Sequence, residues 1–366
     1  MTRKTLGIYG PLPDDRSGVA VYITDSLASL AAYYEHVRVT EPATDPHQFD
    51  QVLYHLGNNA MHHEAFRALA ARPGPVILHE YNNIDYYLSC WDRLPPAERD
   101  RFLALAGQHL GHRFDDRTAL DRYLDARPEL DPYSLDMGVE SIAIGQATEI
   151  LVHSAEAHHV LARRHPQARI QRIPFGVHPV TPQRRTDLLA AHGVPSGAFV
   201  FATFGFLGAY KRIGVLLDAW RQWHDRPADA VLILAGEARD GLTVPDDPTI
   251  VHTGYMPDAD FDQLLVSVDC AIQLRGPWLG ETSGPLTKLL AHRRPVITSE
   301  ITGLRLLDDT RDVTYVPVGG SEVTDLTRAL RARYARRPSA RRFDAAYTWE
   351  AWAAGVFLAL DQAAPV

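Results

Sequence analysis

The stretch Phe199–Trp223 reads FVFATFGFLGAYKRIGVLLDAWRQW, and it decides the fold. Its first six residues are almost entirely apolar, which predicts a buried strand over Phe199–Phe204. Apolar residues then recur with a helical period, which predicts a helix over Arg212–Trp223. Gly205 and Gly208 lie between the two elements. The stretch is therefore a strand–loop–helix unit of the kind that builds a parallel α/β sheet.

The same alternation of apolar runs and helical periods continues through both halves of the chain. It predicts further strands at Thr5–Tyr9, His36–Val39, Gln51–His55, Pro75–His79, Glu149–His153, Ala230–Ala235, Thr249–His252, Asp269–Gln273 and Pro295–Thr298. It predicts further helices at Val19–Leu30, Asp258–Val266, Pro285–Ala291 and about Thr348–Asp361, and an inserted helical pair within Leu94–Arg127. We expect two Rossmann-like domains facing each other across a deep cleft, because ligands bind at the carboxyl ends of parallel strands.

A linker separates the two halves. The segment Arg172–Arg185, RIPFGVHPVTPQRR, contains three prolines and a glycine, which is typical of a domain boundary. A chain of 366 residues is long enough for two domains of about 150 residues each. We predict an N-terminal domain over 1–175, a second domain over 176–347, and a final helix within 348–366 that crosses back to the first domain.

Composition excludes several classes of function. Arginine and lysine number 37 against 45 acidic residues, and the net charge of -8 argues against binding to a nucleic-acid backbone. The two cysteines, Cys90 and Cys270, are too few and too far apart for a disulfide framework or a cysteine zinc site. The first residues, MTRKTLGIYG, lack the apolar core of a signal peptide, and no run of about 18 apolar residues predicts a membrane span. We expect a cytoplasmic protein.

The second half contains two candidate anion-binding segments. Lys211 and Arg212 stand where a helix begins, and cations at a helix N-terminus are unfavourable unless an anion such as a diphosphate docks there. The segment Leu274–Ile297, LRGPWLGETSGPLTKLLAHRRPVI, places Glu281 just before a second helix start. Hydroxyl and backbone N–H groups at that start predict a phosphate cradle. The residues of the cradle are Thr282, Ser283, Gly284 and Pro285.

Polar and glycine residues also follow the strands of the first half. The loop Gly10–Ala20, GPLPDDRSGVA, contains Gly18, where the missing side chain lets backbone approach a ligand closely. His79 directly follows a strand in VILHEYNN, Val76–Asn83. The candidates for contact with an acceptor molecule at these strand ends are Asn58, Asn59, Glu80 and Asn82.

Other chemistries fit the sequence poorly. The motifs HExxH, GxxxxGK[ST] and GxSxG are absent, and no GxGxxG follows the first strand. His62–His63 and His158–His159 are adjacent pairs, whose side chains cannot face one point on a helix. We therefore expect no metal site.

Taken together, these segments resemble the family 4 glycosyltransferases of the GT-B fold. The resemblance rests on six segments in order: the SGVA loop, LHE, ILVHSAEA, RIPFGV, the glycine–Lys211 segment and GETSG…RRPVI. It implies retaining, metal-independent transfer of a hexosyl group from a nucleotide-sugar donor, without a cofactor. The donor would lie mainly on the second domain and the acceptor mainly on the first, and UDP- or GDP-sugars are the expected donors.

The resemblance also implies roles for individual residues. His79 would lie near the transferred sugar, Lys211 would neutralise the leaving diphosphate, and Glu281 would bind sugar hydroxyls; these three are the implied catalytic residues. The implied donor-binding residues are Gly18, Gly205, Arg212, Gly236, Tyr255, Met256, Thr282, Ser283, Gly284, Pro285 and Lys288.

Three positions depart from the family pattern. Lys288 stands where a second glutamate usually holds the ribose hydroxyls, Phe206 replaces an arginine, and Arg293–Arg294 replaces a glycine. We expect Arg212 or Lys288 to supply the phosphate cation that Phe206 lacks. The sequence thus favours a retaining glycosyltransferase with a soluble acceptor, such as a natural product or an oligosaccharide. The alternatives are a nucleotide-sugar epimerase on the same fold and a non-catalytic nucleotide-sugar-binding partner protein.

Overall fold

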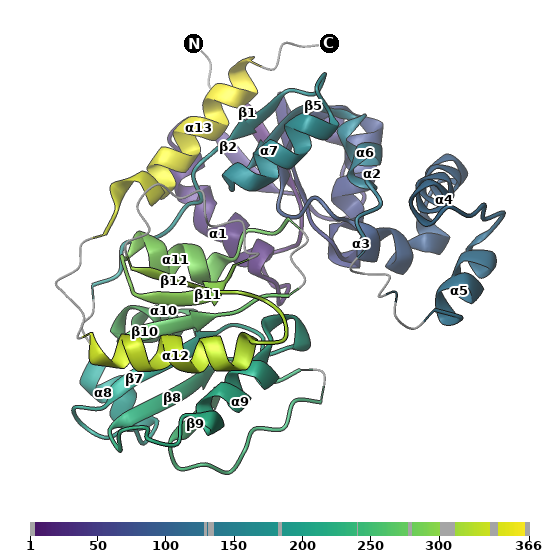
Figure 1. Cartoon of the computed structure of the whole chain (residues 1–366). Coiled ribbons are helices and arrows are strands. Elements are labelled where there is room, and N and C mark those ends of the chain that lie inside the picture. Colours follow the sequence, from purple (N-terminus) through teal and green to yellow (C-terminus); the bar gives the residue numbers. More distant parts are fainter. Residues whose placement is uncertain are drawn as a thin grey trace. The chain divides into compact units, whose positions relative to one another are not determined.

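The chain forms two compact units, each with its own sheet (Figure 1). A computed structural model describes residues 4–127, 130, 135–181, 185–239, 241–276, 280–300, 312–336 and 343–362. Unit 1 comprises Met1–Gly176, Leu279–Thr282 and Trp349–Val366, and unit 2 comprises Val177–Trp278 and Ser283–Thr348. Within the described ranges, no helix combines the length and the hydropathy that crossing a membrane requires. The expected α/β class is confirmed for both units.

The sheet of unit 1 has six parallel strands in the order β2-β1-β3-β4-β5-β6. The strands are β1 Thr5–Tyr9, β2 His36–Val39, β3 Gln51–Leu56, β4 Gly74–Leu78, β5 Ala147–Val152 and β6 Ile170–Arg172. The strand order reverses between β1 and β3, so the carboxyl ends of these two strands border a topological switch point, where ligands of such sheets bind. Five of these strands are close to their predicted positions; β6, at three residues, is too short for a periodic signal.

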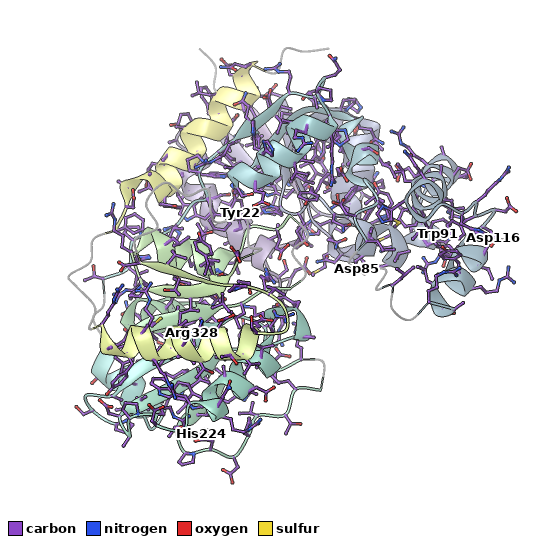
Figure 2. All side chains as sticks on the ribbon, in the orientation of Figure 1. Tyr22, Asp85, Trp91, Asp116, His224 and Arg328 are labelled. Carbon is purple, nitrogen blue, oxygen red and sulfur yellow. The ribbon has the colours of Figure 1, made fainter. Side chains whose placement is uncertain are left out.

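Helices surround this sheet, and one of them comes from the end of the chain. The helices of unit 1 are α1 Gly18–Leu30, η1 Pro46–Gln48, η2 Ala60–His62, α2 His63–Ala71, α3 Ile84–Ser89, η3 Trp91–Arg93, α4 Pro96–Leu110, α5 Arg117–Asp125, α6 Glu140–Ile144, α7 Ala155–Arg164 and α13 Trp349–Gln362. α1 and α13 lie side by side and share one apolar cluster with the sheet. Tyr22 of α1 lies within this cluster, against Trp349 and Trp352 (Figure 2).

α4 and α5 are the helical pair expected within Leu94–Arg127. Gly111 ends α4 in a left-handed conformation, with φ of +63°, and Asp116 caps the N-terminus of α5. Trp91 and Asp116 lie in this region of unit 1 (Figure 2). Phe114 and His112 of the connecting loop pack on Tyr123, which holds the two helices together.

The sheet of unit 2 also has six parallel strands, in the order β12-β11-β10-β7-β8-β9. The strands are β7 Phe199–Phe204, β8 Ala230–Ala235, β9 Ile250–Gly254, β10 Cys270–Gln273, β11 Val296–Ser299 and β12 Val313–Val316. Alternate residues of β7 enter opposite clusters: Phe199 and Phe201 on one face, Val200 and Phe204 on the other. The apolar run at the start of the deciding stretch is therefore a central strand buried on both faces.

Helices cover both faces of this second sheet. They are α8 Arg185–Ala191, η5 Ala209–Lys211, α9 Ile213–Gln222, α10 Asp258–Ser267, α11 Gly284–Ala291, α12 Glu322–Ala335 and η7 Ala345–Tyr347. α9 and α12 contribute Trp220 and Leu330 to one face, and α10 and α11 contribute Leu264 and Leu289 to the other. α12 and β12 were not predicted from the sequence.

We expect Trp352→Ala to destabilise unit 1 by about 3–5 kcal/mol, because Trp352 is fully enclosed between α1 and the sheet. Leu358→Ala, on the same helix but 56% exposed, is the matched control and should change stability by less than about 0.5 kcal/mol. Urea unfolding followed by far-ultraviolet circular dichroism measures both. Equal losses in the two variants would show that α13 does not anchor unit 1.

Candidate functional site

The candidate site of unit 2 lies at the switch point of its sheet. Successive strands run outward from β7 to β9, and β10 then starts on the other side of β7. The connections that follow β7 and β10 therefore leave the sheet in opposite directions. The carboxyl ends of these two strands border the switch point, where ligands of such sheets bind. The two loops that leave these strands are the segments in which the sequence analysis places Lys211 and Glu281.

Two glycines bring the loops after β7 and β8 into backbone contact. A Cβ at Gly236 would lie 2.1 Å from the carbonyl oxygen of Gly205, so only glycine fits there. Gly236 has a φ of +146° and Gly205 a φ of +93°, a left-handed conformation that favours glycine. His252 of β9 completes the junction through a 2.8 Å hydrogen bond between its Nε2 and the carbonyl oxygen of Gly236.

Lys211 is buried at this junction. Its Nζ donates to the carbonyl oxygen of Phe204, and a Cβ at Gly205 would lie 2.8 Å from that Nζ and 3.7 Å from Pro285. The structure thus brings Gly205, Lys211, Gly236 and the start of α11 together. Burial, and next the positive charge of Arg275, lower the pKa of Lys211 to about 7. An anion docking here would reverse that shift.

The two other predicted cations each bind a carboxylate. Arg212 donates from Nε to Oε1 of Glu322 at 2.6 Å and makes a second bond to Oε2. Lys288 donates to both carboxylate oxygens of Asp262, at 2.8 and 3.1 Å. Since each positive charge has an ion-pair partner, neither residue adds an unbalanced cation to the site.

Arg239 is a residue that the sequence analysis did not select. Its guanidinium carbon lies 3.4 Å from the centre of the Phe206 ring, the position where the family pattern has an arginine. The backbone N–H of Arg239 donates to the carbonyl oxygen of Leu207 at 3.1 Å, which ties the loops after β8 and β7 together. Arg239 is exposed and forms no ion pair within the ranges that the structure describes. No spacing rule in the sequence connects positions 206 and 239.

The start of α11 has the expected form. Ser283 is its N-cap and accepts from the backbone N–H of Leu286 at 3.5 Å, while Gly284 and Pro285 begin the helix. Beyond β9, Tyr255 is 59% exposed and Met256 is buried against the core. Gly236 and Gly254 form a bridge, so the Tyr255 loop adjoins the glycine junction.

In unit 1, Gly18 lies at the first turn of α1, beyond the carboxyl end of β1. Ser17 caps this helix by accepting from the backbone N–H of Ala20 at 3.0 Å. Nothing lies within 4 Å of a Cβ built at Gly18. The helix start at Gly18 therefore has open space beside it.

His79 lies at the carboxyl end of β4, in a cluster of four histidines and Tyr22. Its Nε2 is 3.0 Å from Nδ1 of His55, and the rings of Tyr22 and His79 form a T-shaped contact with 4.9 Å between ring centres. Burial lowers the pKa of His79 well below its usual value and lowers the pKa of His55 to about 3. Burial likewise lowers the pKa of His62 and of His153 to about 4. All four rings are therefore neutral at pH 7.

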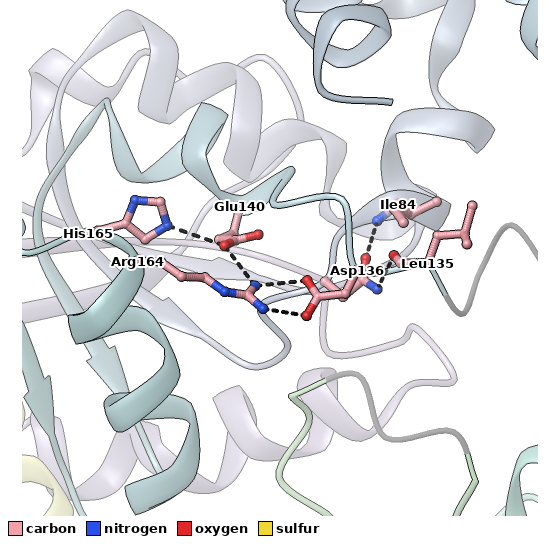
Figure 3. A network of polar contacts seen from close by, with 7 residues as sticks. Ile84, Leu135, Asp136, Glu140, Arg164 and His165 are labelled. Atoms are coloured by element: carbon pink, nitrogen blue, oxygen red, sulfur yellow. Dashed lines mark hydrogen bonds and ion pairs between the residues drawn. The ribbon is translucent and has the colours of Figure 1, made fainter. Parts of the chain in front are cut away.

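The predicted acceptor-side asparagines hydrogen-bond to the backbone of unit 1. Asn58 accepts from the N–H of Tyr86 at 3.3 Å, and Asn59 accepts from that of Met61 at 3.0 Å. Asn82 donates to the carbonyl oxygen of Leu135 at 2.9 Å and accepts from the backbone N–H of Ile84; Figure 3 labels both of these partners within a network of polar contacts. These side chains hold the loops after β3 and β4 in place.

The same network includes a charged group. Arg164 bridges Asp136 and Glu140, and His165 lies 3.2 Å from Glu140 (Figure 3). Arg164 also lies 5.3 Å from the ring centre of Tyr81, two residues after His79. The loop that follows His79 is therefore held both by the backbone bonds of Asn82 and by the contact of Arg164 with Tyr81.

The segment containing Glu281 packs in unit 1, although its sequence neighbours belong to unit 2. A Cβ at Gly280 would lie 2.1 Å from the Tyr81 ring, so Gly280 lies directly against it. Gly280 has a φ of +89°, which favours glycine. Glu281 and Thr282 directly follow this contact with Tyr81, which is itself two residues after His79. Among the described residues, no three His, Cys, Asp or Glu side chains are placed to hold a metal ion.

Solved structures share this fold across the whole chain. The Anabaena protein Alr3699/HepE in complex with UDP-glucose is 14% identical, with 98% of this chain and 95% of that chain covered and a TM-score of 0.55. WaaG, a glycosyltransferase involved in lipopolysaccharide biosynthesis, is 13% identical with the same coverages and a TM-score of 0.54. The sucrose-phosphate synthase of Thermosynechococcus elongatus is 13% identical, again at 98% and 95%, with a TM-score of 0.57. These likenesses confirm the GT-B fold.

At the level of sequence, no protein-family model matches the chain, and no curated protein matches it.

The buried Lys211 predicts a specific pH dependence of stability. The unfolded chain keeps the lysine proton up to a pKa of about 10.4, whereas the folded protein releases it near pH 7. The unfolded state therefore binds more protons than the folded state between pH 7 and 9. The wild-type protein should gain roughly 2 kcal/mol of stability relative to Lys211→Met over this range.

Urea unfolding of both proteins at the two pH values measures this difference. Lys211→Arg, which stays charged throughout, is the control and should show no such gain. Parallel pH profiles of the wild-type protein and Lys211→Met would show that Lys211 is not buried as a titrating group.

Proposed function

We propose that this protein is a retaining, metal-independent glycosyltransferase that uses a nucleotide-sugar donor. The observation that carries the proposal is the buried Lys211 at the glycine junction of a GT-B fold, beside the start of α11. The lysine amine and the backbone N–H groups at a helix start together form a site for a diphosphate. The fold is that of solved glycosyltransferases, one of which binds UDP-glucose, so UDP-sugars are the first donors to test and GDP-sugars the second.

In this proposal unit 2 holds the nucleotide diphosphate. Lys211 and the α11 start at Ser283 stabilise the negative charge that develops as the glycosidic bond to the diphosphate breaks. Tyr255 and Met256 flank the nucleoside. Arg239, held over Phe206, supplies the further cation that the phosphates require, because Arg212 and Lys288 are already paired with carboxylates.

Unit 1 contributes hydrogen-bonding groups for the sugar. His79 and the Glu281 segment contact the transferred sugar, and Gly18 leaves space for its approach. The acceptor is a soluble molecule with a free hydroxyl, a natural product or an oligosaccharide. Its oxygen bonds to the anomeric carbon as the bond to the diphosphate breaks, and its proton passes to a diphosphate oxygen. No side-chain nucleophile is required.

Thermal unfolding with UDP, GDP, ADP, dTDP and CDP, each with and without Mg²⁺, tests the donor site. A ligand at 100 times its dissociation constant adds about 2.7 kcal/mol of stability, which raises the unfolding midpoint by a few degrees. We expect one base to raise it without Mg²⁺ and Lys211→Met to abolish the effect. No shift with any nucleotide at millimolar concentration would contradict the proposal.

Turnover separates an enzyme from a non-catalytic binding protein. With the donor that binds, Glu281→Ala and Lys211→Ala should each lower the rate of sugar release or transfer at least about 10²-fold. Binding without turnover for any acceptor would favour the non-catalytic reading, and a donor altered in the absence of acceptor would favour an epimerase.

Donor binding should weaken at high pH. Lys211 is half-charged near pH 7 in the empty site, and the diphosphate binds its charged form, so binding takes up a proton. The dissociation constant of a nucleotide sugar should therefore rise about tenfold per pH unit between pH 7.5 and 9. Isothermal calorimetry measures it, and Lys211→Arg, which cannot lose its charge, should show a flat profile. A flat wild-type profile would remove Lys211 from the diphosphate site.

A further inference from the structure

The histidine cluster of unit 1 has a proton arrangement that can be worked out from its hydrogen bonds. Two of the four rings face carbonyl oxygens, which can only accept. Nδ1 of His62 lies 2.9 Å from the carbonyl oxygen of His55, and Nδ1 of His153 lies 3.2 Å from that of Pro174. Both rings are neutral, so each carries its single proton on Nδ1.

The proton of Tyr22 follows from this assignment. Nε2 of His153 carries no proton and can only accept, and the Tyr22 hydroxyl lies 2.9 Å from it. Tyr22 therefore donates to His153. Its hydroxyl proton points to His153 and not to His79. The contact between Tyr22 and His79 is the T-shaped contact of their rings.

The remaining pair, His55 and His79, shares one proton. Nδ1 of His55 and Nε2 of His79 are 3.0 Å apart, so one of them donates. Nε2 of His55 is enclosed and has no hydrogen-bond partner among the residues that the structure describes. If His79 donated, the proton of His55 would lie on that enclosed atom as an N–H without an acceptor, and orphaned N–H groups are the rarest kind of unsatisfied group in protein interiors. His55 therefore donates from Nδ1.

We propose that His55 is a positioning residue that fixes the proton of His79 on Nδ1, so that His79 offers an N–H donor, and not a lone pair, to an oxygen atom of the transferred sugar. Nδ1 of His79 makes no hydrogen bond to any residue that the structure describes, and His79 remains 9% exposed. The His55 ring, stacked on His79 at 5.3 Å and 23°, and the edge of Tyr22 fix the ring orientation. The assignment of the sugar as the bound group rests on the proposed function.

The arrangement has a chemical consequence. A neutral imidazole whose Nε2 accepts from His55 has no free lone pair, so His79 cannot act as a general base toward the acceptor hydroxyl. It can stabilise an oxygen that gains negative charge or orient a hydroxyl of the sugar. This fits a reaction in which the diphosphate, and not a side chain, takes the proton.

Two-bond ¹⁵N–¹H correlation spectra of ¹⁵N-histidine-labelled, ligand-free protein test the assignment. The His79 signals are identified by their loss in His79→Gln. We expect the pattern of an Nδ1-protonated neutral ring for His79, and the same pattern for His55, His62 and His153. An Nε2-protonated His79 in the wild-type spectrum would overturn the inference.

Two isosteric variants test the role of His55. His55→Asn can still donate to Nε2 of His79 and should keep the wild-type pattern. The carboxylate of His55→Asp, recorded at a pH above the pKa that burial gives it, can only accept and should move the His79 proton to Nε2. Unchanged His62 and His153 signals are the control for an intact cluster. With a saturating donor, His55→Asp should lower kcat by about 10²-fold and His55→Asn by less than about threefold. Equal kcat in the two variants would contradict the positioning role.

The spectra need neither nucleotide nor turnover, so the two proposals fail separately. Absence of nucleotide binding would contradict the proposed function and leave the proton assignment standing. An Nε2-protonated His79 in a protein that transfers sugar would overturn the proton assignment alone.

Discussion

The close approach of two backbones, at Gly205 and Gly236, is the constraint on which the candidate site of unit 2 depends. The 2.1 Å between the Gly205 carbonyl oxygen and a Cβ at Gly236 leaves no room for any side chain. Because the loops after β7 and β8 meet there, Lys211 can fold over Gly205 and reach the Phe204 carbonyl, and Arg239 can lie on Phe206. A larger residue at either glycine would therefore displace the surrounding groups, Lys211 at Gly205 and the Gly205 backbone at Gly236.

In unit 2, the positive charge of Lys211 is less well stabilised than those of Arg212 and Lys288. Arg212 has a left-handed backbone, with φ of +51°, and its side chain is held by Glu322 at the start of α12, where a carboxylate is favourable. Lys288 is held by Asp262. Within the part of the chain that the structure describes, Lys211 hydrogen-bonds to a carbonyl oxygen alone, so its charge is poorly stabilised until an anion binds. A cation held in place in this way stabilises negative charge that develops during a reaction, and it needs no reorganisation when that charge appears.

The sequence predicted most strands well, missed several helices, among them α7 and α12, and predicted the side-chain partners poorly, for physical reasons. Strands such as β7 and β8 are continuous apolar runs, and their bounds follow from periodicity alone. Arg212 was expected to bind phosphate because it stands where a helix begins, and Arg212 or Lys288 was expected to supply the cation that Phe206 lacks. Their carboxylates come from α12 and α10, which lie 110 and 26 residues away. His55 gave no signal either, because a buried histidine inside YHL has the pattern of any strand residue.

The two units use different kinds of polar group, and this difference follows from burial. In unit 1 the four clustered histidines are enclosed, so desolvation holds them neutral, and the asparagines after β3 and β4 are bound to backbone. What unit 1 offers is a set of uncharged donors and acceptors in fixed directions, which suits the hydroxyls of a sugar. Unit 2 offers cations, which suit phosphates. Each unit thus offers one of the two chemistries that a nucleotide sugar contains, hydroxyl recognition in unit 1 and phosphate recognition in unit 2.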